Sequence, residues 1–330
     1  MESSYKKAGV DIDAGEQAIK NIKSMVKGTF SKNVLTNIGG FGGLFEFDFK
    51  DYKNPVLVSS ADGVGTKLIV ANKANRHDTV GQCLVNHCVN DILTTGAKPL
   101  YFLDYVGTGK LDQEVFHDIV AGLTKACREN NCSLIGGETA EMPGIYQTDD
   151  YDLVGTITGI VDKQDILVDR VRKSDVLIGL KSSGLHTNGY SLARSVLFEK
   201  HDVNDFVEEI GATLADALLQ VHRSYLKPVE PFLKDPALHA ISHVTGGGII
   251  GNTKRVVPEN MSLYVDWKAW EWLPVFKYIQ KLGKISDNEM GRVFNLGIGL
   301  ILVVDAAKVD DFMKKLTAAG EEPAIIGEIV

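Results

Sequence analysis

The sequence predicts the α+β fold class, with two mixed α/β domains. Three observations predict it. Short apolar runs rich in Val and Ile alternate with segments of helical periodicity. A length of 330 residues is typical of two domains. The polar, charge-rich stretch 162–175 separates the two halves. We therefore expect an N-terminal domain over 1–165 and a C-terminal domain over 166–330.

The first half predicts alternating strands and helices. Four apolar runs predict strands: 55–60, 99–106, 132–138 and 152–162. Two segments have apolar side chains at helical spacing and predict helices: 78–97 and 112–130. Asp112 is a suitable N-cap for the second helix because its carboxylate can accept from the free backbone N–H groups of the first turn.

The second half predicts a mixed sheet packed with helices. Five apolar runs predict strands: 176–184, 239–244, 261–267, 298–304 and 324–330. Three segments predict helices: 188–200, 274–283 and 308–320. A fourth segment, 203–227, is predicted to be mainly helical.

Charge and composition disfavour several classes of function. Thirty-five Lys and Arg face 43 Asp and Glu, a net charge of −8, which disfavours nucleic acids and acidic membranes as partners. The N-terminal residues have no apolar run typical of a signal peptide. The longest apolar stretch, "LGIGLILVV", is too short to span a bilayer. A cytoplasmic protein is expected.

The four cysteines allow two interpretations. Cys83 and Cys88, like Cys127 and Cys132, are spaced C-x4-C, and a zinc site is conceivable. Structural zinc usually takes turn-held pairs. Three of these cysteines lie within helical apolar patterns, so buried reduced thiols are the favoured interpretation.

Two glycine-rich stretches in the first half are candidates for binding ATP phosphates. The first is "IGGFGGLFEF", where Gly39, Gly40, Gly42 and Gly43 would let backbone N–H groups approach a ligand. It is not followed by a helix, so it does not match a dinucleotide-binding loop, and a flexible hairpin is an equal alternative. The second is "SSADGVGTK", which spaces its glycines wrongly for a Walker loop. Its candidate residues are Asp62, Gly63, Gly65, Thr66 and Lys67.

Carboxylates near these strand ends are candidate Mg²⁺ ligands. Asp62 ends an apolar strand, although an ordinary Asp-Gly turn is an even alternative. Asp91 lies among apolar residues of a helix, where an unpaired carboxylate is costly unless it faces solvent. Glu138 and Glu141 follow a strand and a Gly-Gly pair in "GGETAEMPG". The sequence does not show whether these carboxylates meet.

Two further junctions in the second half combine a strand, a glycine turn and a helix, which favours anion binding. The candidate substrate-binding residues are Ser183, Gly184, His186 and Asn188 in "SSGLHTNGYS", and Thr245, Gly246, Gly247 and Gly248 in "HVTGGGIIGN". The pKa of an ordinary histidine suits proton transfer, so His186 is a candidate catalytic residue. The other seven histidines, such as His77 and His222, are interpreted as surface or core residues.

The order and spacing of these motifs closely resemble the phosphoribosylformylglycinamidine cyclo-ligase family. The motifs are "SYKKAGVDIDAGE", "GGFGG", "DGVGTK", "VNDI", "FLDY", "GGETAEMPG", "SSGLHTNGYS" and "TGGG". The first and "GGETAEMPG" are long and specific, whereas "TGGG" and "GGFGG" are not. The resemblance extends from Ser4 to about Gly327.

The resemblance implies an activity and a site. ATP would phosphorylate the formyl amide oxygen of formylglycinamidine ribonucleotide, and ring closure would yield 5-aminoimidazole ribonucleotide. Mg²⁺ would be held by Asp62, Asp91 and Glu138. Lys67 would contact the ATP phosphates as a catalytic residue beside His186, and Lys23 or Lys27 is a weaker candidate. The N-terminal domain would pair with its copy in a homodimer.

Two other interpretations remain open. Another ATP-dependent enzyme of the same superfamily, such as a thiamine-monophosphate kinase or a selenophosphate synthetase, is one. The latter would be expected to carry a reactive Cys near its N-terminus, and no Cys precedes Cys83. A nucleotide-binding regulatory protein without catalysis is the other, and the retained carboxylates and His186 disfavour it.

Overall fold

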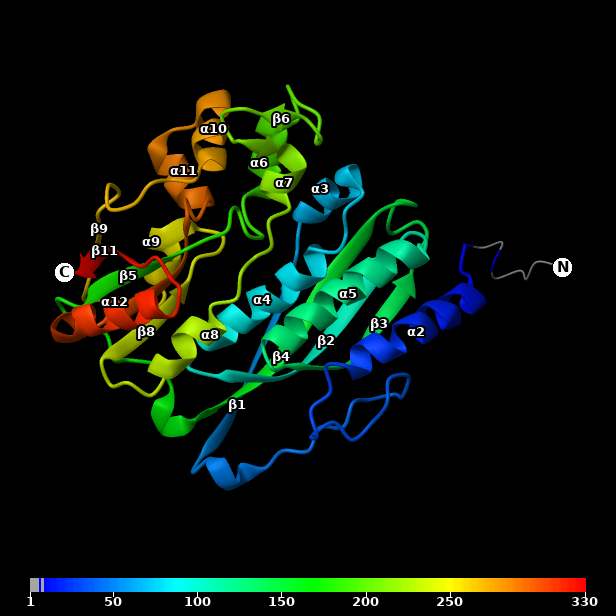
Figure 1. Ribbon diagram of the computed structural model, residues 1–330, viewed down its shortest axis with the longest axis horizontal. Coiled ribbons are helices and arrows are strands. Elements are labelled where there is room, and N and C mark those ends of the chain that lie inside the picture. Colours follow the sequence, from blue (N-terminus) through cyan, green and yellow to red (C-terminus); the bar gives the residue numbers. More distant parts are fainter. Residues whose placement is uncertain (1–5, 7–8) are drawn as a thin grey trace.

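A computed structural model describes Lys6 and residues 9–330, and Figure 1 shows its elements. The first sheet has the strand order β1-β4-β2-β3. Its strands are β1 Pro55–Gly63, β2 Lys98–Thr108, β3 Ser133–Glu141 and β4 Tyr151–Asp162. Only the β2–β3 pair is parallel. The four predicted strands are thus confirmed, each one to three residues longer than its apolar run. Part of the first motif, residues 4, 5, 7 and 8, lies outside the described residues.

Among the described residues of the first half there are four longer α-helices: α2 Ile12–Lys27, α3 Lys67–Ala74, α4 Val80–Leu93 and α5 Gln113–Glu129. The two predicted helices are confirmed as α4 and α5, and Asp112 caps α5 as expected. Helix α2 was not predicted, although Ala18, Ile22 and Val26 form a buried stripe at helical spacing. The carboxylate of Asp11 caps it by accepting from the N–H of Ala14.

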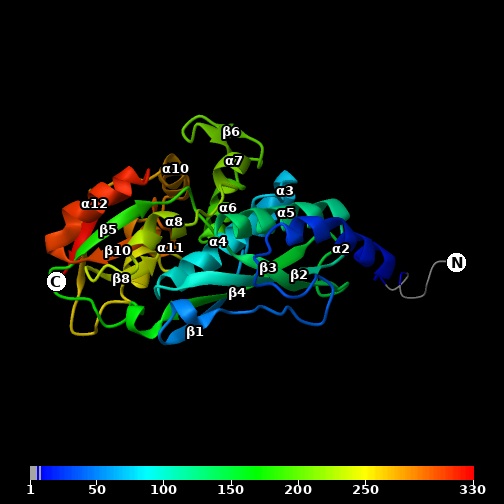
Figure 2. The same cartoon turned by 60° about the horizontal axis from the view of Figure 1, so that its bottom comes forward.

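Helices α2, α4 and α5 lie on one face of the first sheet, and its other face carries no helix among the described residues (Figure 2). Side chains alternate between the two faces along each strand. Leu57 of β1 and Leu103 of β2 point to the helix-free face and are 64% and 36% exposed. This sheet therefore keeps apolar side chains on an uncovered surface.

The second sheet has the order β8-β10-β5-β11-β9. Its strands are β5 Val176–Lys181, β8 Leu238–His243, β9 Leu263–Val265, β10 Ile298–Val304 and β11 Ala324–Ile329. The five predicted strands are confirmed, but the prediction of a mixed sheet is wrong, because every neighbouring pair is antiparallel. Helix α12 connects the parallel strands β10 and β11, and β5 runs between them in the opposite direction.

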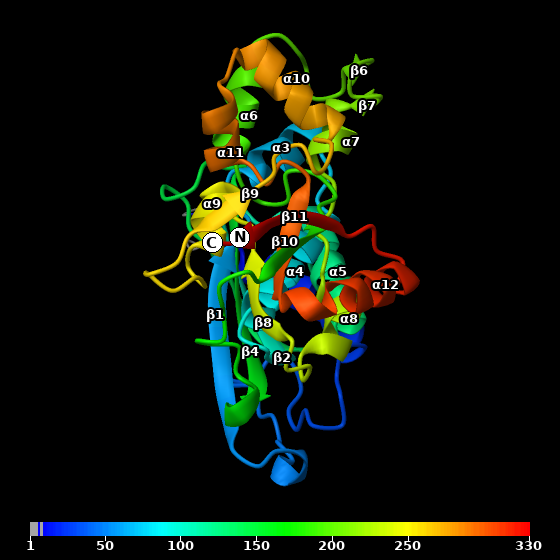
Figure 3. The same ribbon diagram turned by 90° about the vertical axis from the view of Figure 1, so that its left-hand side faces the viewer.

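The helices of the second half lie partly on this sheet, which α9 and α12 contact, and partly beyond it, where Figure 3 shows α6, α10 and α11 together near α3. They are α6 Tyr190–Leu197, α7 Leu214–Leu218, α8 Leu226–Val229, α9 Gly248–Thr253, α10 Pro274–Gly283, α11 Asp287–Val293 and α12 Val309–Ala318. Helices α6, α10 and α12 confirm three predictions. The boundary predicted at residue 165 falls between the two sheets.

The prediction of a mainly helical segment over 203–227 is wrong. This segment holds a two-stranded sheet, β6 Phe206–Val207 with β7 Ala212–Thr213, then the single-turn helix α7 and an irregular stretch. Gly211, at φ +76°, turns the chain between the two strands. In the irregular stretch 219–225, the carbonyls of His222 and Arg223 and the N–H of Tyr225 bond to asparagines of α4 rather than to a neighbouring helical turn, which is why helical periodicity does not predict the structure of this stretch.

Helix α4 is buried on nearly all sides because the first sheet, α5 and residues 220–229 surround it. The amide of Asn86 donates to the carbonyl of His222, and that of Asn90 donates to the carbonyl of Arg223. All four cysteines are buried and free, as the favoured interpretation predicted. Across the described part of the chain, no helix combines the length and the apolar character needed to cross a membrane.

Candidate functional site

Two of the predicted metal-binding carboxylates lie together at the end of β1. Asp62 lies near the end of β1, and Asp91 lies in the last turn of α4, which covers that end of the strand. His87, one turn earlier on α4, joins them: its Nε2 is 3.0 Å from Asp62 Oδ2 and 3.5 Å from Asp91 Oδ2. His243, the last residue of β8, places its Nδ1 2.7 Å from Asp91 Oδ1. The two halves of the chain therefore meet at this cluster.

The electrostatics of the cluster keep Asp62 ionised. Burial by itself would raise the pKa of Asp62, but the hydrogen bond and the charge of His87 outweigh it and hold the pKa below its usual value. Burial would likewise lower the pKa of His87, but the hydrogen bond of Asp62 and the negative charges of Asp91 and Asp62 raise it. Burial lowers the pKa of His243 despite its bond to Asp91.

The structure does not bring Glu138 to this cluster within one chain. One row of residues crosses the sheet from Asp62 on β1 to Gly155 on β4, Asp104 on β2 and Gly137 on β3. Strands β1 and β3 are therefore opposite edges of the sheet. Three strand spacings separate them, about 14 Å. Asp62 points to the helix-covered face, whereas Glu138, one residue after Gly137, points to the other face and is exposed. A single chain therefore supplies two of the three predicted carboxylates to one place.

A cavity of about 340 Å³ lies between α2 and the β3 edge. Ile19, Ile22 and Leu134 make part of its apolar lining, and Ile38, the residue before the glycine-rich loop, lines it as well. Gly43 packs against Ile135 of β3, since a Cβ on this glycine would lie 2.9 Å from the Ile135 side chain. The predicted phosphate loop thus lies beside the cavity, with Gly39, Gly40 and Gly42 exposed.

Asp104 also lines this cavity, although it was not among the predicted site residues. Burial raises its pKa to about 7. The sequence could have indicated Asp104, because a carboxylate is unusual in a strand among Phe102, Leu103 and Tyr105. A carboxyl group that changes its charge near neutral pH inside a cavity is a candidate for proton transfer.

The raised pKa of Asp104 predicts a pH-dependent stability effect. The unfolded carboxyl has a pKa of 3.8, so the native state binds its proton more tightly and loses stability as the pH rises from 3.8 to about 7. We expect Asp104→Asn to raise the free energy of unfolding by about 2 kcal/mol at pH 8, after allowance for partial exposure, and to change it little at pH 4. Urea unfolding at both pH values measures this, and an equal effect at the two would contradict it.

Lys67 lies inside the protein, with no exposed side-chain area. Its Nζ donates to the carbonyls of His186, at 2.9 Å, and Gln220, at 2.6 Å. In this position the amine links the end of the "SSADGVGTK" stretch, residues 59–67, to the second half of the chain. Contact with an ATP phosphate, predicted above, would require the side chain to leave these carbonyls, so that role stays a prediction. Thr66 makes a second link, through a 3.2 Å contact with the hydroxyl of Ser191.

The two anion-site candidates of the second half lie next to each other. A Cβ on Gly246 would lie 3.3 Å from the side-chain oxygen of Asn188, so the loops around 183–188 and 245–248 face one another. His186 is buried, stands in the left-handed region at φ +61°, and accepts a bond from the Ser183 N–H through Nε2. Burial lowers the pKa of His186 well below the usual value, and the charges of His243 and Lys67 lower it further.

Two asparagines without a predicted role hold these loops in place. Asn295, in the stretch "EMGRVFNLGIG", donates to the carbonyl of Gly184 and accepts from the hydroxyl of Ser182. Asn252 donates to the carbonyl of Gly248 and accepts from the hydroxyl of Thr245. The sequence could have indicated both asparagines, because each lies close to a glycine-rich stretch. Helix α9 has only six residues. The bonds of Asn252 hold the conformation of the loop that precedes this helix.

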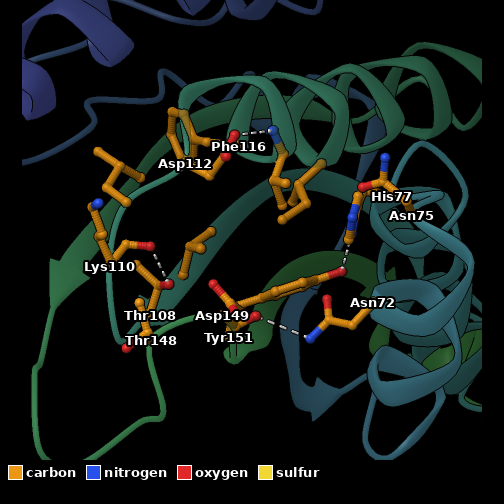
Figure 4. A pocket seen from close by; sticks show the side chains of 14 residues that line it. Asn72, Asn75, His77, Thr108, Lys110, Asp112, Phe116, Thr148, Asp149 and Tyr151 are labelled. Atoms are coloured by element: carbon orange, nitrogen blue, oxygen red, sulfur yellow. Dashed lines mark hydrogen bonds between the residues drawn. The ribbon is translucent and has the colours of Figure 1, made fainter.

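A further cavity of about 340 Å³ lies between β2, α3 and α5 (Figure 4). His77 Nδ1 and the hydroxyl of Tyr151 are 2.9 Å apart across it, and Asn72 donates to the carbonyl of Asp149. His77, interpreted as a surface or core residue, is buried there.

Comparisons with known proteins cover nearly the whole chain. Residues 49–161 match the family described as AIR synthase related protein, N-terminal domain, and 172–330 match AIR synthase related protein, C-terminal domain. The phosphoribosylformylglycinamidine cyclo-ligase of Alkaliphilus oremlandii is 47% identical over 333 residues, covering 100% of this chain and 98% of the relative. The enzyme of the same name from Thermoanaerobacter sp. is 48% identical over 330 residues, covering 99% and 97%.

Solved structures share the fold at low identity. A thiamine-monophosphate kinase from Stenotrophomonas maltophilia superposes with a TM-score of 0.70 at 16% identity, covering 94% of this chain and 93% of that one. The hydrogenase maturation protein HypE, solved in complex with ATP, has a TM-score of 0.69 at 17% identity, covering 98% and 88%. At these identities the comparison concerns the fold alone.

Proposed function

This chain belongs to the phosphoribosylformylglycinamidine cyclo-ligase family, and on that premise we propose that it closes the imidazole ring of 5-aminoimidazole ribonucleotide in de novo purine biosynthesis. The observation that carries the proposal is the relation to curated cyclo-ligases at 47–48% identity over 99–100% of the chain. The substrate is formylglycinamidine ribonucleotide, ATP is the co-substrate, and the cytoplasm is the expected compartment.

The reaction needs activation of a poor leaving group. Transfer of the γ-phosphoryl group of ATP to the formyl amide oxygen forms a P–O bond and releases ADP. The amidine nitrogen then attacks the same carbon, the C–O bond breaks, and the oxygen leaves as inorganic phosphate. Proximity of the two reacting ends inside one site accounts for much of the expected acceleration.

The ATP site is proposed at the glycine-rich loop. The apolar cavity beside Ile38 is large enough for an adenine ring, and the exposed glycines at 39, 40 and 42 would present backbone N–H groups to the phosphates. Asp62 and Asp91 are close together and suit Mg²⁺, which takes oxygen ligands and would neutralise charge on the transferred phosphoryl group.

The separation of Glu138 from Asp62 supports a homodimer. If the three carboxylates serve one site, a second copy must bring its β3 edge to the β1 edge of the first. The helix-free sheet face offers a surface for that pairing, with Leu57 and Leu103 exposed on it. The partner would then complete a site that one chain leaves open.

A charge on this face is expected to separate the subunits. Leu103→Glu buries a carboxylate in the proposed interface, which should raise the dimer dissociation constant at least a hundredfold, about 3 kcal/mol. Light scattering after size-exclusion chromatography measures the mass. Ile325→Glu, at a 49% exposed position of β11, is the matched control and should leave the dimer intact. A monomeric native protein, or a dimeric Leu103→Glu, would contradict the pairing.

The ribonucleotide phosphate is proposed at the paired loops of the second half. The backbone N–H groups around Ser183, Asn188 and Thr245 lie among glycines that let an anion approach the backbone. His186 is kept neutral by burial, so it can accept a proton from the attacking amidine or support the phosphorylated amide.

An assay with the purified chain tests the function. With formylglycinamidine ribonucleotide, ATP and Mg²⁺ we expect 5-aminoimidazole ribonucleotide, ADP and phosphate in equal amounts. Thiamine monophosphate in place of the ribonucleotide should yield no product. Absence of ring closure with the first substrate, from a protein that still binds ATP, would overturn the proposal.

A further inference from the structure

We propose that the cavity between β2, α3 and α5, shown in Figure 4, binds an adenine nucleoside that carries no phosphate. The chemical class is a flat nitrogen heterocycle with a hydroxyl-bearing tail. This site is additional to those proposed for ATP and for the ribonucleotide. The inference does not rest on ring closure, and binding alone tests it.

The cavity is separate from the carboxylates at the end of β1. Tyr151, which lines it, lies four residues along β4 from Gly155, the pairing partner of Asp62. At about 3.4 Å per residue, this separation is about 14 Å. Leu111 and Phe116 form the wall that this cavity shares with the one proposed for the adenine ring of ATP. The two cavities therefore lie on either side of these side chains.

The lining of the cavity combines an apolar part with a polar part. Val106, Phe116 and Ile119 are buried, with at most 3% of their surface exposed. Asp112 and Asp149, which also line the cavity, are exposed. A ligand would therefore place an aromatic ring against the buried residues and a polar tail toward solvent. The volume of about 340 Å³ is within the range of sites for small molecules.

His77 and Tyr151 together hold one hydrogen for which the protein supplies no acceptor. Burial lowers the pKa of His77 and raises that of Tyr151, so both side chains are uncharged at pH 7. Each then has one polar hydrogen, whereas their 2.9 Å contact through His77 Nδ1 uses only one of the two. Among the described residues neither side chain has another hydrogen-bond partner. Whichever of them donates within the pair, the other is left to donate to a ligand.

Burial makes this unused hydrogen informative. His77 is 5% exposed and Tyr151 is 8% exposed, and both line the cavity. A buried donor without an acceptor costs about 1–3 kcal/mol. A ligand with an acceptor atom, such as a ring nitrogen, removes this cost. The pair therefore favours a heterocycle over a purely apolar ligand.

Asn72 supplies a donor and an acceptor to the same cavity. Its Nδ2 gives one hydrogen to the carbonyl of Asp149 at 3.1 Å, which leaves a second hydrogen and the side-chain oxygen. Figure 4 shows Asn72 and His77 on one side of the cavity, with Lys110 and Asp112 on the other. A carboxamide with a free donor and a free acceptor can pair with N7 and the N6 amino group of adenine. Adenine is therefore the base that we infer.

The charges of the lining disfavour a phosphorylated ligand. Asp112 and Asp149 contribute two negative charges, and Lys110 contributes one positive charge. Neutral His77 contributes none. The excess negative charge repels a phosphate group. Exposed carboxylates are suitable acceptors for ribose hydroxyls, as in dinucleotide-binding folds. A nucleoside therefore fits this lining better than AMP or ATP does.

Calorimetric titration of the full-length chain with adenosine tests the site. An excess of a non-hydrolysable ATP analogue with Mg²⁺ is present throughout, so that the site proposed for ATP is filled. We expect one adenosine per chain with a Kd below about 1 mM, and at least tenfold weaker binding of AMP. Tyr151→Phe and Asn72→Ala should each weaken adenosine binding about fivefold, because each removes a hydrogen-bonding group. Asn72 is only half-buried, so its variant tests the site even if Tyr151→Phe unfolds.

The matched control is Tyr278→Phe. The hydroxyl of Tyr278 also contacts a histidine, His201, at 2.5 Å, but this pair belongs to the second half of the chain and does not line the cavity. Adenosine affinity should be unchanged in that variant. Displacement of adenosine by the ATP analogue would overturn the inference, as would equal affinity for AMP. Tighter binding of spermidine than of adenosine, or an equal loss in Tyr278→Phe, would also overturn it.

Discussion

Asp91→Asn is expected to lower kcat/KM for ring closure by about a thousandfold, which corresponds to about 4 kcal/mol of transition-state stabilisation. Asp91 is one of two carboxylates that meet at the end of β1, and it is hydrogen-bonded by His243 and by the hydroxyl of Ser60. Asparagine has nearly the same shape but no charge, so the substitution removes the electrostatic attraction for a cation while it leaves packing in place.

Steady-state kinetics with saturating ATP measure this effect, and circular dichroism verifies the fold. Asp310→Asn, at an exposed position in the first turn of α12, is the control and should keep full activity. If Asp91→Asn bound ATP and turned it over at the native rate, a regulatory nucleotide-binding role would become the better interpretation.

Asn90→Ala is expected to lower the free energy of unfolding by about 3 kcal/mol. The side chain of Asn90 is fully buried, donates to the carbonyl of Arg223 and accepts from the N–H of Tyr225 at 2.9 Å each. Alanine would leave both backbone groups buried without partners, at about 1–3 kcal/mol apiece. The irregular segment 219–225 would lose its attachment to α4, and the contact between the two halves would loosen.

Urea unfolding followed by circular dichroism measures this change. Asn21→Ala is the control, because the amide of Asn21 accepts from Gln17 on the exposed face of α2 and its loss should change the free energy by less than about 0.5 kcal/mol. Similar effects of the two substitutions would show that the bonds of Asn90 do not hold the segment.

The spacing of apolar residues along the chain was sufficient to predict most strands and most of the long helices. The apolar spacing of α4 and the cap of α5 are properties of neighbouring residues, and both elements occur where predicted. Local pattern failed for 203–227, because that segment contains helix-forming residues whose backbone groups bond to α4 instead. Helix α2 was missed although its buried stripe is visible in the sequence.

The candidate site was predicted in its parts but not in its arrangement. Asp62 and Asp91 were predicted to be metal ligands from their types and surroundings, and the fold brings the two side chains together. His87 had a visible signal, since four residues separate it from Asp91 on one helix face. His222 and His243 had none, because their partners lie far away in the chain. Glu138 was grouped with the two aspartates, whereas the strand order separates them.

The sequence alone determined the family, the strand and helix types, and the residue types available for phosphate and cation binding, because these depend on composition and on short-range spacing. Only the tertiary structure decided which of those residues meet. Strand order and side-chain alternation place Asp62 and Glu138 at opposite edges and on opposite faces. The docking of β8 against α4 joins His243 to Asp91. Such contacts depend on how the two sheets and α4 pack together, and no local pattern carries that information.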